Sequence, residues 1–238
     1  MVFGRSKLKC TPDFFYNNKK LEVVSDFSYL GVLFNYNGNF SKTKAKLIEQ
    51  ARRAMFAVIN KSRKLNLPES LQLHLFDTIS MPILVYSSEV WGFENLRIIE
   101  QFQLKYCKLI LNLKPSTPNC MVYGELGITP VTLLTKSRVL CYWSKVLNAK
   151  NDKICKLLYN TALFFHNNNI IISPWISFVK NCLDELGMSE YFVNQHVDNV
   201  NHFKLLVKSR LYDQFLQHWH ETINNSPKCL VYRMYKKE

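Results

Sequence analysis

The spacing of apolar residues changes once along the chain, close to Asn37-Gly38. Before this point the apolar side chains come in short runs rich in aromatic and β-branched residues, which is typical of strands. After it they recur every three or four residues, the spacing of one face of an α-helix, through most of the remaining sequence. The pattern predicts a mainly α fold that begins with a short antiparallel β segment.

The β segment contains one expected hairpin and one further strand. Phe14–Tyr16 and Leu21–Val24 flank Asn17-Asn18, and asparagine tolerates the positive φ of a tight hairpin turn. Phe27–Phe34 follows as another strand with Gly31 in its interior. A glycine inside a strand is typical of a bulge or of a close backbone approach.

The first helix is expected over residues 41–65, with Ser41 as its N-cap. Its apolar stripe includes Leu47, Ala51 and Val58. Glu49 is the one acidic residue among the basic residues of the remaining surface, so the helix has few carboxylates for i,i+4 pairing. These basic residues are Lys42, Lys44, Lys46, Arg52, Arg53, Lys61, Arg63 and Lys64.

Further helices follow almost without interruption. Pro68 is placed to start a helix, and Pro82 to kink or end it. Helical spacing also predicts helices over residues 96–113, 131–147, 153–163, 175–186 and 199–223. The polar run His166–Asn169 is expected to form a loop and is the best candidate for a boundary between subdomains.

The positive charge is concentrated near the N-terminus. The formal net charge of the chain is +13, from 31 basic and 18 acidic residues. Residues 1–64 hold 13 basic and 4 acidic side chains and so account for +9 of it. A gradient of this kind indicates a surface for a polyanionic partner, because Lys and Arg along one face can follow a phosphate backbone.

No arrangement of residues indicates a catalytic or metal site. None of the seven aspartates is adjacent to another, whereas a two-metal site needs clustered carboxylates. Asp184 and Glu185 are neighbours, but neighbours on a helix point in different directions. His218 and His220 diverge for the same reason. Glycine-rich phosphate-binding motifs and a G-x-S-x-G motif are absent from the sequence.

The cysteines and the hydropathy suggest a compartment. The seven cysteines are widely spaced and form no C-x-x-C motif, which favours a reducing environment. The first residues lack the apolar core of a signal peptide, and no apolar stretch approaches the roughly 20 residues of a membrane helix. We expect an intracellular protein, nuclear or cytoplasmic, that does not bind membranes.

The order of these segments resembles the region that follows the catalytic centre in reverse transcriptases of non-LTR (LINE-like) retrotransposons. Met1-Val2-Phe3-Gly4 resembles the strand that closes the palm, and Phe27–Gly31 resembles the primer grip. The basic helix at 41–65 resembles the start of the thumb. The segments that resemble the family's post-thumb region are Glu89–Gly92, Ile99–Leu111, Tyr123–Gly127, Arg138 and Tyr142-Trp143. The resemblance extends to about residue 163 and is looser beyond it.

The resemblance implies a division into four parts and a piece of a longer enzyme. Residues 1–38 would be the end of the palm with the primer grip, 39–114 a helical thumb, 115–165 post-thumb helices and 166–238 a C-terminal helical segment. The family's aromatic-x-Asp-Asp motif is absent from this sequence, and so is its C-terminal Cys/His knuckle. We therefore expect a chain that is not an enzyme by itself and holds no cofactor, although the parent enzymes use Mg²⁺.

The resemblance also implies binding roles within the first 65 residues. Tyr29, Leu30 and Gly31 would lie near the primer end, with Gly31 admitting close backbone contact. An RNA/DNA template–primer duplex is the expected partner, and its phosphates would be bound by Lys42, Lys46, Arg52 and Arg53. Core packing is the alternative role for Tyr29, Leu30, Trp91 and Trp143. The alternative for the whole chain is a helical protein-interaction module without a nucleic-acid role, and the sequence leaves the oligomeric state open.

Overall fold

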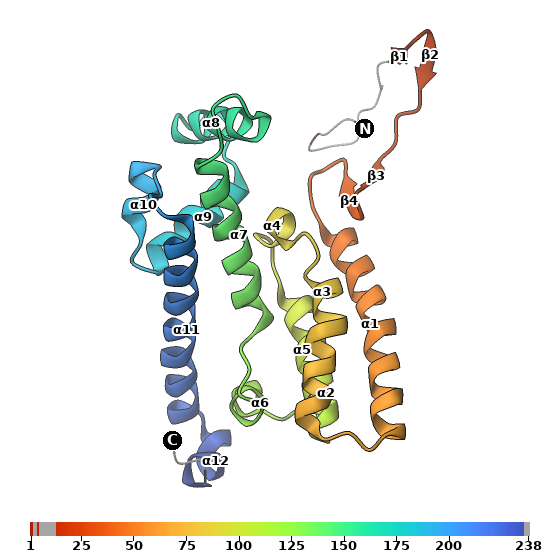
Figure 1. The fold of residues 1–238 in the computed structure, drawn as a ribbon, viewed down its shortest axis with the longest axis vertical. Coiled ribbons are helices and arrows are strands. Elements are labelled where there is room, and N and C mark those ends of the chain that lie inside the picture. The colour runs from red at the N-terminus through yellow and green to blue at the C-terminus, as the bar shows by residue number, and fades with distance from the viewer. Residues whose placement is uncertain (2–3, 5–12, 236–238) are drawn as a thin grey trace. The chain divides into compact units, whose positions relative to one another are not determined.

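The computed structural model describes residues 1, 4 and 13–235 (Figure 1). The chain forms two compact units, which are described separately. Unit 1 comprises Met1–Leu67 and His74–Ser87, and unit 2 comprises Pro68–Leu73 and Ser88–Glu238. Short antiparallel strand pairs are followed by helices, so the predicted fold class is confirmed. Most of the strand expected over residues 1–3 lies outside the described residues.

The strands of unit 1 form two separate hairpins. β1 (Phe14–Tyr16) pairs with β2 (Lys19–Leu21) around Asn17-Asn18, where both residues have positive φ as the sequence predicts. β3 (Asp26–Tyr29) pairs with β4 (Val32–Asn35). The expected single strand over 27–34 is therefore wrong, because the chain reverses at Leu30-Gly31 and Gly31 belongs to a turn.

Helix α1 (Ser41–Lys64) agrees closely with its expected bounds. Its N-cap is Phe40 rather than Ser41, and the Asn39 side chain accepts a hydrogen bond from the Ser41 amide. The predicted apolar stripe is buried, and it packs against the segment that contains Phe76 and Met81. This packing gives unit 1 its helical core.

A π-helical turn separates α2 (Glu69–Leu75) from α3 (Met81–Leu84). It covers Phe76–Ser80 and comes just before Pro82. Proline lacks an amide hydrogen and its ring clashes with the carbonyl four residues earlier, so a regular α-helix cannot pass through it unchanged. The wider turn accommodates Pro82, in agreement with the expected kink.

Unit 2 is built from helices around one main hydrophobic core. These helices are α4 (Ser88–Trp91), α5 (Arg97–Ile110), α6 (Asn119–Leu126), α7 (Val131–Leu147), α8 (Ile154–Asn167), α9 (Pro174–Glu185), α10 (Ser189–Asn194), α11 (Val200–Asn225) and α12 (Leu230–Tyr235), with a 3₁₀ turn at Pro227–Cys229. The helices expected over 131–147, 175–186 and 199–223 agree with α7, α9 and α11 within one or two residues. α8 continues through His166 and Asn167, which were expected to lie in a loop.

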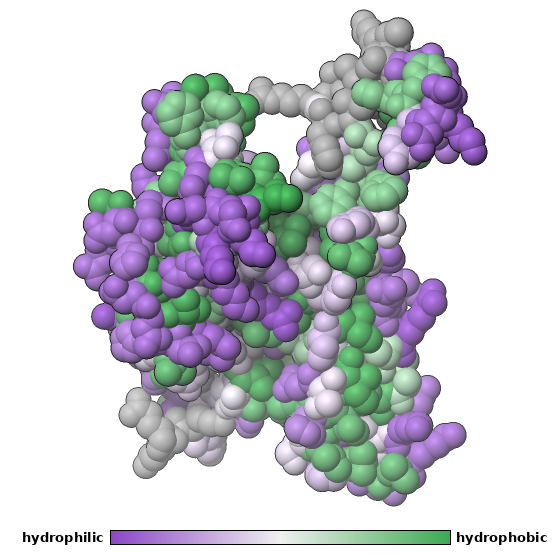
Figure 2. All heavy atoms as spheres, turned by 45° about the horizontal axis from the view of Figure 1, so that its top comes forward, coloured by the Kyte–Doolittle hydropathy of each residue, from purple (hydrophilic) through white to green (hydrophobic). Residues whose placement is uncertain are grey.

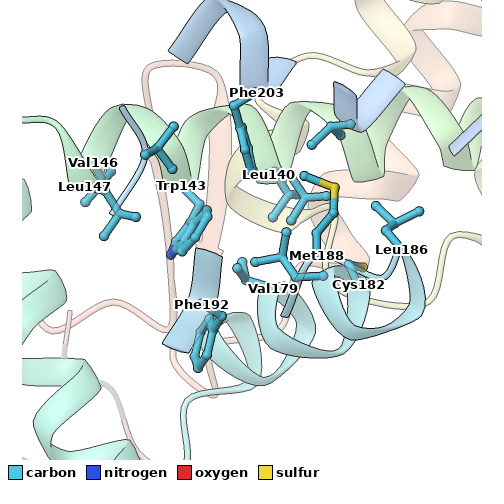
Figure 3. Close-up of a cluster of buried hydrophobic side chains, with 14 of the residues drawn as sticks. Leu140, Trp143, Val146, Leu147, Val179, Cys182, Leu186, Met188, Phe192 and Phe203 are labelled. Atoms are coloured by element: carbon cyan, nitrogen blue, oxygen red, sulfur yellow. The ribbon is translucent and has the colours of Figure 1, made fainter. Parts of the chain in front are cut away.

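The core of unit 2 centres on Trp143, whose side chain is fully buried (Figure 3). Side chains from α7, α9, α10 and α11 converge on it, with Phe192 stacked on the indole at a centroid distance of 6.3 Å. The indole Nε1–H donates to the Tyr159 hydroxyl, 2.9 Å away. Trp91 is also fully buried, so core packing is the role of both tryptophans.

Candidate nucleic-acid interface

The predicted primer-grip residues lie at a two-residue turn between β3 and β4. Tyr29 pairs with Val32, which leaves Leu30 (φ 45°) and Gly31 (φ 84°) as the central residues. Positive φ at both central positions matches the twist of the flanking strands and is usually supplied by Asn, Asp or Gly. Leu30 is an exception, because a leucine with positive φ has a steric cost of about 1 kcal/mol or more.

The turn backbone is held from two sides. The Tyr86 hydroxyl donates to the Leu30 carbonyl oxygen at 2.9 Å, and the Lys46 Nζ lies 3.4 Å from the Gly31 carbonyl oxygen. A Cβ at residue 31 would lie only 3.1 Å from the Tyr86 ring. Gly31 therefore admits a close contact, as expected, and in this structure the contact is with Tyr86.

The turn side chains point away from the core. The Leu30 side chain is 73% exposed and the Tyr29 side chain 59% exposed. The alternative role, packing in the core, is therefore wrong for Tyr29 and Leu30. The Leu30 and Tyr29 side chains are thus exposed at the surface, while hydrogen bonds from Tyr86 and Lys46 hold the backbone of the turn in place.

Lys42 lies beside this hairpin, where it is already paired. Its Nζ is 2.7 Å from Asp26 Oδ2, and Asn35 donates to Asp26 Oδ1, also at 2.7 Å. The hydrogen bond from Lys42, followed by that from Asn35, lowers the pKa of Asp26 below its ordinary value. Asp26 is therefore ionised at neutral pH and competes with any phosphate for Lys42.

The two predicted arginines lie further along α1. They follow Lys46 by six and seven residues, or roughly 10 Å along the helix axis. Arg52 pairs with Glu49 at 3.2 Å and Arg53 with the same carboxylate at 3.7 Å. Both side chains are half exposed or more, so these are weak surface pairs that a phosphate can replace.

One member of the predicted basic flank is on the wrong side of the helix. The Lys44 side chain is buried, with 4% exposure, and belongs to the packed face of α1. Hydrophilic side chains gather at the right-hand edge of Figure 2, where α1 lies in Figure 1. The structure thus brings Tyr29, Leu30, Gly31, Lys42 and Lys46 together and places Arg52 and Arg53 beyond them, while their binding role stays a prediction.

Three residues that were not predicted as site residues shape this surface. Tyr86 contacts the turn, and Asp26 pairs with Lys42. The Thr43 hydroxyl forms hydrogen bonds with both the amide and the carbonyl group of Leu33. Tyr86 lies 56 residues from its partner, so local pattern carried no signal for it. Asp26 could have been found, since an acid next to a predicted primer grip is a natural partner for a nearby lysine.

The described residues were compared with the requirements of a metal site and of a membrane-spanning helix. Within residues 1, 4 and 13–235, no three His, Cys, Asp or Glu side chains come together as metal ligands. None of the helices in that part of the chain has the length and apolarity needed to cross a bilayer.

Comparison with known proteins yields one informative similarity. The chain is 30% identical over 93 residues to an uncharacterised transposon-derived protein of Caenorhabditis elegans. The aligned part is 38% of this chain and about a third, 32%, of that protein. No family model matches the sequence and no solved structure matches the chain. The similarity points to a transposon origin and identifies no activity.

Substitution of Gly31 tests the geometry of the turn. We expect Gly31→Ala to lower the free energy of unfolding of unit 1 by about 2 kcal/mol, because it adds a Cβ both at positive φ and against Tyr86. Gly38→Ala is the matched control, since Gly38 also has positive φ but nothing within 4 Å of the added Cβ. Denaturant unfolding of both variants measures the difference. Equal losses would show that the Tyr86 contact contributes nothing.

Proposed function

We propose that unit 1 binds an RNA/DNA template–primer duplex, as the primer grip and first thumb helix of a non-LTR retrotransposon reverse transcriptase would. In this proposal the β3–β4 turn approaches the primer end and the exposed face of α1 follows the phosphate backbone. Phosphate contacts position a duplex without reading its sequence, so the binding would be largely independent of sequence.

Leu30 is the observation that carries the proposal. Asn or Gly would form the same turn with less strain, and the exposed Leu30 side chain contributes little to the core. Strained residues cluster where a protein contacts its ligand. A leucine kept at such a position is explained if its side chain contacts a partner molecule, such as the sugar or base at the end of a primer.

Two further observations support this assignment. Lys42 and Lys46 lie on the first two turns of α1 beside the hairpin, so an apolar tip and two cations share one surface. The similarity to a transposon-derived protein agrees with the origin implied by the primer-grip and thumb segments.

The alternative, a protein-interaction module, is favoured by the surface of α8. Hydrophobic side chains gather over this helix at the upper left of Figure 2. Ile154, Leu157, Leu158 and Phe164 are all more than half exposed. Such a surface can bind another protein segment, and on this alternative the chain would have no nucleic-acid role.

Charge reversal on α1 tests duplex binding. We expect replacement of Lys42, Lys46, Arg52 and Arg53 by Glu to lower the affinity for an RNA–DNA hybrid at least tenfold at low salt, because each replaced residue loses a phosphate contact. Replacement of the same four residues by Gln removes the charge without repulsion from Asp26. It should lower the slope of log K against log salt by up to about 4. Fluorescence anisotropy at several salt concentrations gives both quantities.

The matched control reverses four exposed lysines elsewhere, namely Lys105, Lys150, Lys153 and Lys180. It makes the same change in net charge and should leave most of the affinity for the hybrid intact. An equal loss in both variants would mean that total charge, and not the surface of α1, determines binding.

Leu30→Asn separates binding from stability. Asn tolerates positive φ better than Leu, so we expect the free energy of unfolding to rise by about 0.5–1 kcal/mol. The affinity for the hybrid should fall at the same time, since the apolar tip is lost. Unchanged affinity in a stabilised variant would contradict the role of Leu30. It would not bear on the cation contacts, which the charge-reversal variants test.

Primer extension tests the proposal that this chain is not a polymerase by itself. The purified chain with an RNA template, a DNA primer and Mg²⁺ or Mn²⁺ should synthesise no DNA, because its sequence lacks the adjacent aspartates that bind the two metal ions. A complete reverse transcriptase in the same mixture is the positive control. Primer elongation that persists through purification would refute the proposal.

A further inference from the structure

A basic hollow lies between α7 and α11 in unit 2, remote in sequence from the α1 surface. It has a volume of about 360 Å³. Its walls carry two cations from each helix, one carboxylate and one aromatic ring. These side chains are Arg138, Lys145, Lys204, Lys208, Glu89 and Tyr142.

The spacing of the cations concentrates charge on one side of each helix. Arg138 and Lys145 are two helical turns apart on α7, and Lys204 and Lys208 are one turn apart on α11. Residues at these spacings share a helix face, and like charges four residues apart repel each other. Four cations against one carboxylate therefore give the hollow a net positive potential that attracts anions.

The three lysines of this hollow are not neutralised by any carboxylate of the described residues. Lys136, on the same helix α7, is paired with Glu185 at 3.1 Å. Within the described part of the chain, no carboxylate lies within 4.0 Å of the ammonium groups of Lys145, Lys204 or Lys208. The side chains of these three lysines are exposed and can take an external anion.

Tyr142 adds an aromatic ring to the hollow, which the binding of an inorganic anion would not require. Its ring is 40% exposed and also lines a second hollow of about 300 Å³, together with Tyr159 and Trp175. Tyr142 and Trp175 meet edge to face with their centroids 6.2 Å apart. The two hollows thus share one aromatic wall, with cations in the first and apolar or aromatic side chains in most of the second.

We propose that these two hollows bind single-stranded nucleic acid, with phosphates at Lys145, Lys204 and Lys208 and an unpaired base against Tyr142. Aromatic rings next to a basic groove are the usual means of binding single strands. The bases of a duplex are stacked on each other, so a duplex could use the cations but not the ring. The proposal concerns unit 2 and stands or falls independently of duplex binding by unit 1.

Binding of a short labelled RNA or DNA strand of mixed sequence to the full chain tests the proposal. We expect Lys204→Glu with Lys208→Glu to lower the affinity about tenfold at low salt, and the salt slope by about 1.4. Tyr142→Ala should lower the affinity about fivefold, whereas Tyr142→Phe should keep it because the ring remains. The charge-matched control is Lys105→Glu with Lys180→Glu, two exposed lysines outside the hollows.

Circular dichroism and thermal unfolding establish that each variant remains folded. Loss of single-strand affinity in the Lys204/Lys208 variant, with binding retained in the control, would support the site. Equal loss in both variants, no loss in either, or equal affinity of Tyr142→Ala and the unmodified chain would overturn it. Competition by polyphosphate as effective as competition by unlabelled single strand would also overturn it, because the base would then contribute nothing.

Discussion

Two hydrogen bonds between Thr43 and Leu33 hold the β3–β4 hairpin on the first turn of α1. The Thr43 hydroxyl donates to the Leu33 carbonyl at 2.6 Å and accepts from the Leu33 amide at 3.2 Å, and the Thr43 side chain is fully buried. A two-stranded hairpin is at best marginally stable alone, so packing against a helix supplies the stability that the two strands lack by themselves. This link also fixes Leu30 and Gly31 beside Lys42 and Lys46, and the proposed duplex surface depends on it.

The spacing and type of neighbouring residues predicted those parts of the fold that depend only on local sequence. The change of period near Gly38, the Asn17-Asn18 turn and the bounds of α1 and α7 follow from side-chain spacing and backbone preferences, and the structure agrees. The turn at Leu30-Gly31 did not follow, because leucine gives no turn signal. Its conformation is held by Tyr86, which lies on a distant segment of the sequence. A strand is recognised from a few consecutive residues, and these residues carry no information on a contact with Tyr86.

The candidate site shows the same division. Sequence alone identified Lys42, Lys46, Arg52 and Arg53 as a basic group because composition and helical spacing suffice for that. It placed Lys44 on the same flank, whereas this residue is buried in the structure. The pairing of Lys42 with Asp26 requires the β3 strand to fold back onto α1, a tertiary contact between residues 16 positions apart.

Carboxylate pairing distinguishes the two proposed nucleic-acid surfaces physically. On α1, Lys42 is paired with Asp26, and both arginines share Glu49, so a phosphate must displace a carboxylate at three of the four predicted contacts. Such exchange of partners gains less than the pairing of a free cation, and fewer counterions are released than the number of cations suggests. In the hollow between α7 and α11, Lys145, Lys204 and Lys208 have no such carboxylate within ion-pairing distance among the described residues. For one and the same nucleic acid, binding at these three lysines should therefore release more counterions per cation than binding along α1, although α1 belongs to the more basic part of the sequence. The net charge of a segment thus indicates that an anion is attracted, while the local pairing of each cation determines how strongly it is held.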